Sequence, residues 1–184
     1  MPPQETPRPV SPAANTNGFT ARDVAGILRE REWLAGEGTP AQNAWCERAA
    51  ALLGPQVSDR GSLAELLQLV FQYDAKKLLG RVESHAVLAR YAAREVLRHL
   101  ALLLLEGAPL GTERFKEIIN VLKERVGLSS REIFHPIRLA LTGRAGEGEL
   151  DRVILLIDEA AAAGFVMPVK PARERILEFC AALD

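Results

Sequence analysis

Apolar residues recur every three or four positions along most of this chain, which is the spacing of amphipathic helices. Glycine, proline and short polar stretches interrupt the pattern. It predicts helices over approximately residues 20–35, 41–53, 62–70, 84–105, 112–126, 130–142, 149–163 and 171–184. No segment shows the strict alternation of a β-strand, and aromatic residues make up only 5% of the chain. We therefore expect an all-α fold.

Residue types at the ends of these segments support the predicted boundaries. Thr20 with Asp23 three residues later matches a capping box, and Ser62 is placed to cap the third helix. Ser129 or Ser130 is expected to cap the helix that follows it. The run Leu100–Leu105 is apolar all round, so this helix end should be deeply buried.

Composition divides the chain into three parts. Residues 1–19 contain five prolines and few apolar groups, so they are expected to form a disordered tail. The glycines and proline of residues 107–111 mark a boundary between two helical subdomains, residues 20–110 and residues 111–184.

Several classes of function find no support in the sequence. No run of about 18 apolar residues or signal peptide is present, which predicts a cytoplasmic protein without a membrane segment. Cys46 and Cys180 are expected to be reduced thiols. His85, His99 and His135 lack the spacing of metal ligands, and no phosphate loop or dinucleotide fingerprint occurs, so we expect neither a metal nor a cofactor.

The most informative stretch is IFHPIRLALTGR at residues 133–144. Helical geometry places Phe134, Ile137 and Leu141 on one face, which should belong to the core. Arg138 falls outside this stripe, so its guanidinium is expected to reach solvent or a partner. Gly143 supplies the backbone freedom that commonly ends a helix.

This stretch resembles a known signature. Pro136, Arg138 and the sequence LALTG at 139–143 are similar to the anticodon-binding region of bacterial glutamyl-tRNA synthetases, class I enzymes that join glutamate to tRNA. Looser matches, spread over about residues 60–184, are Phe71, Tyr73, Asp74, Phe115, Lys116, the segment 148–155 and Arg173–Arg175. The resemblance implies a helical bundle that binds tRNA.

The same resemblance argues against catalysis by this chain alone. Synthetases of this class activate the amino acid in a separate domain with HIGH-like and KMSKS-like motifs, and neither motif occurs here. Lys76, Lys77 and Lys170 lack the neighbours that a KMSKS loop requires. The expectation is a free-standing, non-catalytic module that acts alone or with a catalytic synthetase partner.

By position, the resemblance assigns the reading of an anticodon base to Arg138. An arginine fork can stack on an unpaired base or hydrogen-bond its edge. The alternative is an arginine that pairs with a neighbouring carboxylate, such as Asp151 or Glu149.

The turn after Gly143 departs from the family pattern. Leu150 matches an apolar position beside the anticodon loop, whereas Glu147 and Gly148 stand where the family has threonine and proline. A carboxylate near an RNA backbone is electrostatically unfavourable, and the glycine loosens the turn.

A second candidate surface is the series Arg90, Arg94 and Arg98, which recurs every four residues on the predicted helix 84–105 and could contact phosphates. The alternative is a solvated helix face paired with Glu95. The overall charge does not favour RNA binding, because the chain has 23 basic and 24 acidic residues.

Two hypotheses follow. The first is a tRNA-binding module related to glutamyl-tRNA synthetase, with glutamate tRNA as the candidate ligand. Its interface would contain Arg138, Glu147, Gly148, Leu150 and the three arginines. The second is a helical protein-interaction domain that has kept the fold but lost RNA recognition, and that binds a protein partner or forms a homodimer.

Overall fold

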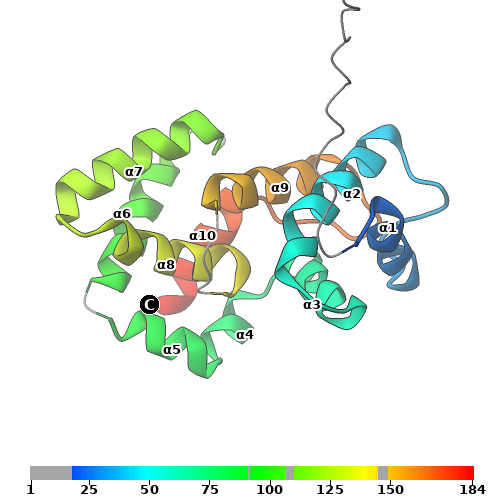
Figure 1. The fold of residues 1–184 in the computed structure, drawn as a ribbon. Helices are drawn as coiled ribbons and strands as arrows, with labels where there is room; N and C mark the ends of the chain where they lie inside the picture. The colour runs from blue at the N-terminus through cyan, green and yellow to red at the C-terminus, as the bar shows by residue number, and fades with distance from the viewer. Residues whose placement is uncertain (1–17, 91, 107–109, 145–148) are drawn as a thin grey trace, which may run out of the picture.

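The computed structural model describes residues 18–90, 92–106, 110–144 and 149–184, and these residues form helices and connecting turns without any strand (Figure 1). The predicted all-α class is confirmed. The helices are α1 (Ala21–Glu30), α2 (Pro40–Leu53), the short 3-10 helix η1 (Gly54–Gln56), α3 (Arg60–Phe71), α4 (Ala75–Leu79), α5 (Val82–Leu88), α6 (Ala93–Leu105), α7 (Thr112–Val126), α8 (Ser130–Thr142), α9 (Leu150–Ala162) and α10 (Ala172–Leu183).

Side-chain caps fix where the first helices begin. The Thr20 backbone N–H donates to the Asp23 carboxylate at 2.7 Å, as the predicted capping box requires. The predicted cap of α3 is wrong: Asp59, not Ser62, is the capping residue, and its carboxylate accepts the Ser62 backbone N–H at 2.9 Å. The helix therefore begins two residues before Ser62.

The first helix is shorter than its apolar pattern predicts. It ends at Glu30, and Glu32 follows with a left-handed backbone conformation, φ 60°. This turn buries Trp33, whose ring stacks on Phe71 with centroids 4.9 Å apart. Burial of the Trp33 indole contributes more to the free energy of folding than another solvent-exposed turn of helix would.

The long helix predicted over residues 84–105 is two helices. It is interrupted between Leu88 and Ala93, and Ala92 takes a left-handed conformation with φ 66°. Because of this break, α5 and α6 can both pack against α8. Tertiary packing overrides a sequence that contains no glycine or proline at the break.

The predicted burial of the whole run Leu100–Leu105 is also wrong. Leu100 and Leu104 are fully buried, whereas Leu102 is 57% and Leu105 is 59% exposed. Six consecutive residues cover more than one helical turn, so they point to every side of the helix. The neighbouring helices α7, α8 and α10 do not enclose all of those sides.

The buried side chains form two clusters. One lies among α1, α2 and α3 and includes the aromatic rings of Trp33, Trp45, Phe71 and Phe165. The other lies among α4–α8 and α10. Helix α9 joins the two clusters, because Leu156 belongs to the first and Ile157 to the second. Figure 1 shows α9 extending from the group around α7 and α8 toward α2.

Two predictions about organisation have different outcomes. Phe19, predicted to belong to the tail, packs against the first cluster, and the rest of that predicted tail, except Gly18, lies outside the described residues. The subdomain limits 20–110 and 111–184 stay a prediction, and the two clusters describe packing without testing whether either part folds alone.

Candidate nucleic-acid interface

Helix α8 carries the signature and is defined at both ends by local chemistry. Of the two predicted caps, Ser129 and Ser130, the Ser129 side chain caps its start, in a reciprocal box with Glu132. Gly143 ends it with φ 72°, and its N–H donates to the Leu139 carbonyl at 2.8 Å. A Cβ on Gly143 would also collide with the Leu78 side chain of α4. Glycine therefore favours both this turn and the close approach of Leu78 of α4 to the end of α8.

Arg138 lies inside the molecule, so of the two expectations for its guanidinium, solvent or a partner, the first is wrong. Only 8% of it is exposed, because α8 is surrounded by α5, α6, α7, α9 and α10. The Thr142 hydroxyl donates to the Arg138 carbonyl at 3.0 Å, within the same last turns of the helix. Of the two carboxylates considered as its partners, Glu149 is in an ion pair with Arg152.

Arg138 borders a cavity of about 180 Å³ that we call the apolar hollow. It lies between α3, the second half of α8 and the middle of α9. Aliphatic side chains form most of its wall. The lining residues are Leu53, Gln56, Leu66, Leu69, Val70, Arg138, Thr142, Arg144, Val153, Leu156, Ile157 and Arg175.

A second cavity of about 230 Å³, here called the polar hollow, opens beside the first. Arg144 and Leu69 line both, so the two hollows meet at the end of α8. The polar side chains that line the polar hollow, besides Arg144, include Glu65, Gln68, Gln72, Asp74, Lys77 and Arg81. Sequence reasoning did not select Arg144, although a cation directly after the helix-ending glycine was the available signal.

The predicted series of three arginines does not form one stripe. Arg90 lies in the turn before α6, and its guanidinium is 3.0 Å from Nδ1 of His135. Arg94 and Arg98 are exposed on α6, and Arg98 pairs with Asp184 at 3.3 Å. The prediction of a continuous helical stripe is wrong because the helix is broken at Ala92.

Of the three residues predicted at the turn after Gly143, the structure describes only Leu150. Glu147 and Gly148 lie outside the described residues. Leu150 is the first residue of α9 and is only 5% exposed, since it packs in the second cluster. Its side chain supports the start of α9 from within the core.

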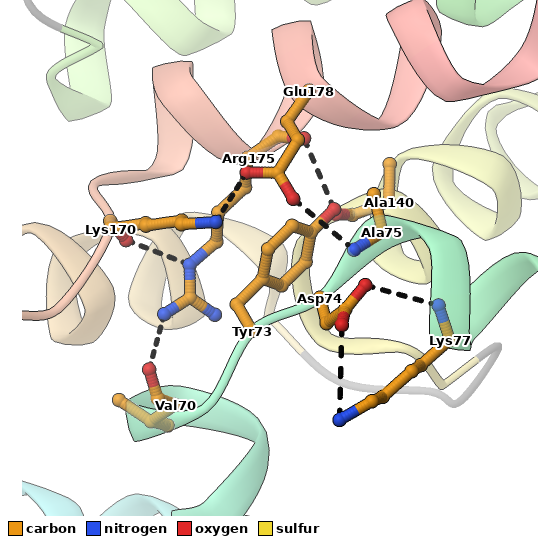
Figure 2. A network of polar contacts seen from close by, with 9 residues as sticks. All are labelled: Val70, Tyr73, Asp74, Ala75, Lys77, Ala140, Lys170, Arg175 and Glu178. Atoms are coloured by element: carbon orange, nitrogen blue, oxygen red, sulfur yellow. Dashed lines mark hydrogen bonds and ion pairs between the residues drawn. The ribbon is translucent and has the colours of Figure 1, made fainter.

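A buried arginine that sequence reasoning matched only weakly lies close to this site. Arg175 of α10 is fully buried and lies over the ring of Tyr73, with the guanidinium carbon 4.8 Å from the ring centroid (Figure 2). Burial lowers the pKa of Arg175 to about 10, so it is protonated at pH 7. Burial also raises the pKa of Tyr73, which is therefore neutral.

Other chemistry is not evident among the described residues. They contain no group of three or more His, Cys, Asp or Glu side chains placed to hold a metal. Burial raises the pKa values of the Cys46 and Cys180 thiols to about 11, and neither cysteine is in a disulfide. No helix in the described part of the chain is both long and apolar enough to cross a membrane.

Comparison with known proteins identifies the family. A family model described as an anticodon binding domain matches residues 23–160, which is more than half of the chain and includes α8. The glutamate–tRNA ligase of Carboxydothermus hydrogenoformans is 30% identical over 106 residues, covering 58% of this chain and 22% of that protein. Glutamate–tRNA ligase 1 of Rubrobacter xylanophilus is 35% identical over 112 residues, covering 55% of this chain and 26% of that protein.

A third relative, the glutamate–tRNA ligase of Bacillus subtilis, is 29% identical over 118 residues, covering 64% of this chain and 24% of its own. The chain thus spans about a quarter of the length of these curated relatives. These matches confirm the resemblance to the anticodon-binding region of glutamate–tRNA ligases. The chain belongs to the anticodon binding domain family.

Proposed function

We propose that this chain is a non-catalytic module that binds the anticodon loop of a tRNA, with glutamate tRNA as the first candidate. The family match and the glutamate–tRNA ligase relatives support the class of ligand. The observation that carries the proposal is the junction of the two hollows at the end of α8, where the exposed Arg144 lies between them.

The shape and chemistry of this junction suit unpaired bases. Single-stranded loops are recognised by splayed bases that enter pockets, stack on planar side chains and form hydrogen bonds along their edges. Arg138 would contact a base in the apolar hollow, and Arg144 would hold the backbone or a neighbouring base at its mouth. The amides of Gln68 and Gln72 offer both donors and acceptors in the polar hollow.

The remaining predicted contacts have secondary roles in this proposal. Glu147 and Gly148 lie outside the described residues, so their contact with the anticodon loop stays a prediction. Leu150 would act by anchoring α9 in the core. Arg94 and Arg98 are exposed and could contact phosphates, whereas Arg90 would do so only separately from them.

The proposal is limited to tRNA binding. The 184 residues contain neither a HIGH-like nor a KMSKS-like motif, so activation of glutamate is not part of the proposal, and a catalytic synthetase partner is a separate prediction. Such a partner, a homodimer and a cytoplasmic location all stay predictions. The family match favours RNA recognition over a fold kept only for protein interaction.

Substitution at the junction tests the site directly. Arg144→Ala should weaken binding of glutamate tRNA by about 1–3 kcal/mol, because a positioned arginine is lost. Arg131→Ala is the matched control: it removes another exposed arginine, at the opposite end of α8, and should leave affinity nearly unchanged. Fluorescence anisotropy with labelled tRNA measures both.

Arg138 needs a different variant because it is buried. Arg138→Met keeps most of the volume and removes the fork, and it should reduce the preference for the native anticodon. Thermal unfolding must show that the variant remains folded at the assay temperature. Unchanged affinity and preference in both Arg144→Ala and Arg138→Met would reject this interface.

A further inference from the structure

Arg175 joins three separate parts of the chain through backbone carbonyl groups. Its Nε donates to the Lys170 carbonyl at 2.7 Å. Its Nη1 donates to the carbonyls of Leu69 at 3.0 Å and Leu141 at 3.1 Å, and its Nη2 donates to that of Val70. Figure 2 shows the guanidinium between α10 and the end of α3, with its bonds to Lys170 and Val70.

The acceptors explain how a buried cation is tolerated here. Leu69 and Val70 are in the last turn of α3, and Leu141 is in the last turn of α8. Carbonyls in a last turn lack partners within their own helix and carry the negative end of the helix dipole. One protonated guanidinium therefore caps two helix ends together, which a single ammonium group cannot do with the same geometry.

Tyr73 strengthens the same connection. Its hydroxyl lies 2.5 Å from the Ala140 carbonyl oxygen of α8 and 3.1 Å from the Arg175 carbonyl oxygen of α10. Its ring also supports the guanidinium from one side. Beside it, Glu178 of α10 accepts from Lys170 at 2.5 Å and from the backbone N–H of Ala75 at 3.3 Å.

We infer that Arg175, supported by Tyr73, is a positioning residue that holds the last turn of α8 at a fixed place relative to α3. This inference rests on the proposed function. The apolar hollow lies between these two helices, and Leu69, Val70 and Arg175 are in its wall together with Arg138. Loss of the guanidinium would let the end of α8 shift, and Arg138 and Arg144 would lose their alignment with bound bases.

The chain supplies a matched control two residues away. Arg173 also donates from Nε to a helix-end carbonyl, that of Leu104 at 2.8 Å, but this contact joins α10 to α6. Arg173→Met therefore removes a comparable bond without touching α3 or α8. Arg175→Lys keeps the charge but lacks the fork, so it should not restore what Arg175→Met loses.

The first readout is the ratio of dissociation constants for native glutamate tRNA and a copy with a changed anticodon, measured below the unfolding temperature of each variant. In Arg175→Met the ratio should fall by about tenfold, the scale of one well-placed base contact. Arg173→Met should keep the wild-type ratio. A purely structural role would lower the unfolding temperature without changing the ratio.

The second readout does not depend on RNA. Backbone hydrogen exchange within residues 139–143 should accelerate at least about tenfold in Arg175→Met, and not in Arg173→Met. If Arg175→Met does not fold, Tyr73→Phe removes one hydroxyl from the same connection and should produce a smaller change of the same kind.

The outcomes separate the two claims. A wild-type chain that ignores the anticodon would reject the proposed function, and the exchange measurement would still decide whether Arg175 holds α8. A wild-type chain that discriminates, with an unchanged ratio and unchanged exchange in Arg175→Met, would reject the inference alone. An equal decrease of the ratio in Arg175→Met and Arg173→Met would also reject the inference.

Discussion

Two large buried polar side chains, those of Trp45 and Arg175, are satisfied mainly by distant backbone groups. The Trp45 indole N–H donates to the Leu156 carbonyl at 2.8 Å, and Arg175 donates to four carbonyls. Each such bond offsets the cost of removing a polar group from water. Several of these partners are more than 100 residues away in sequence, which makes the bonds invisible to any local pattern.

A pH prediction follows from the cap of α3. Hydrogen bonds from the Ser62 backbone N–H and hydroxyl hold the pKa of Asp59 below its usual value. A carboxyl whose pKa is lowered on folding stabilises the folded state above its unfolded pKa, and this contribution is lost as pH falls through the folded pKa. We therefore expect acid to weaken this cap below about pH 4.

Asp59→Asn tests this prediction because asparagine still caps a helix but does not titrate. The variant should be close to wild type at pH 7, and its free energy of unfolding should fall less steeply between about pH 5 and 2. Urea unfolding at several pH values measures this difference. Parallel curves for the two proteins would show that Asp59 does not contribute.

At the scale of the helices, local sequence predicted the beginnings and ends better than the interruptions. The signature helix follows its cap at Ser129 and its glycine at 143 because both signals act within one turn. The break at Ala92 and the turn at Glu32 arise from packing against distant helices, and no residue at either place signals it. The burial of Arg138 was not predicted for the same reason, since the helices that cover it are distant in the sequence.

Gly143→Ala should be strongly destabilising. It places a side chain in a left-handed conformation, which costs about 1–3 kcal/mol, and it adds a collision with Leu78. Gly111→Ala is the control, since a Cβ added to Gly111 would meet no neighbouring atom and its φ is an ordinary −84°. Denaturant unfolding should show a clearly larger loss for the first variant, and equal stability of the two would contradict this account of the end of α8.

Ser129→Ala should remove the cap at the other end of the same helix. Its hydroxyl and backbone both contact Glu132, and loss of such a cap costs about 1 kcal/mol. Ser130→Ala changes the exposed neighbouring residue and should have little effect. Calorimetric unfolding of the two variants measures the contrast, and a comparable decrease in both would show that the box does not stabilise α8.

At the scale of the whole molecule, the helical class and the family could be predicted from the sequence, whereas the site could only be outlined. The spacing of apolar residues was sufficient to predict the helical class, and the residues around Arg138 were sufficient to predict the family. The two hollows combine α3, α8 and α9, and their wall depends on contacts between residues distant in the chain. Arg175 donates to the ends of α3 and α8, and α9 contributes to both clusters of buried side chains, so the proposed interface depends on the packing of both clusters.

The most direct test of the central claim is the affinity of the unaltered chain for unmodified glutamate tRNA and for a copy with a changed anticodon. Fluorescence anisotropy at about 50 and 200 mM salt would separate phosphate contacts from base recognition. We predict binding that weakens with salt and prefers the native anticodon at both concentrations. Absent binding, or equal affinity for the two tRNAs, would contradict the account and direct attention to protein partners.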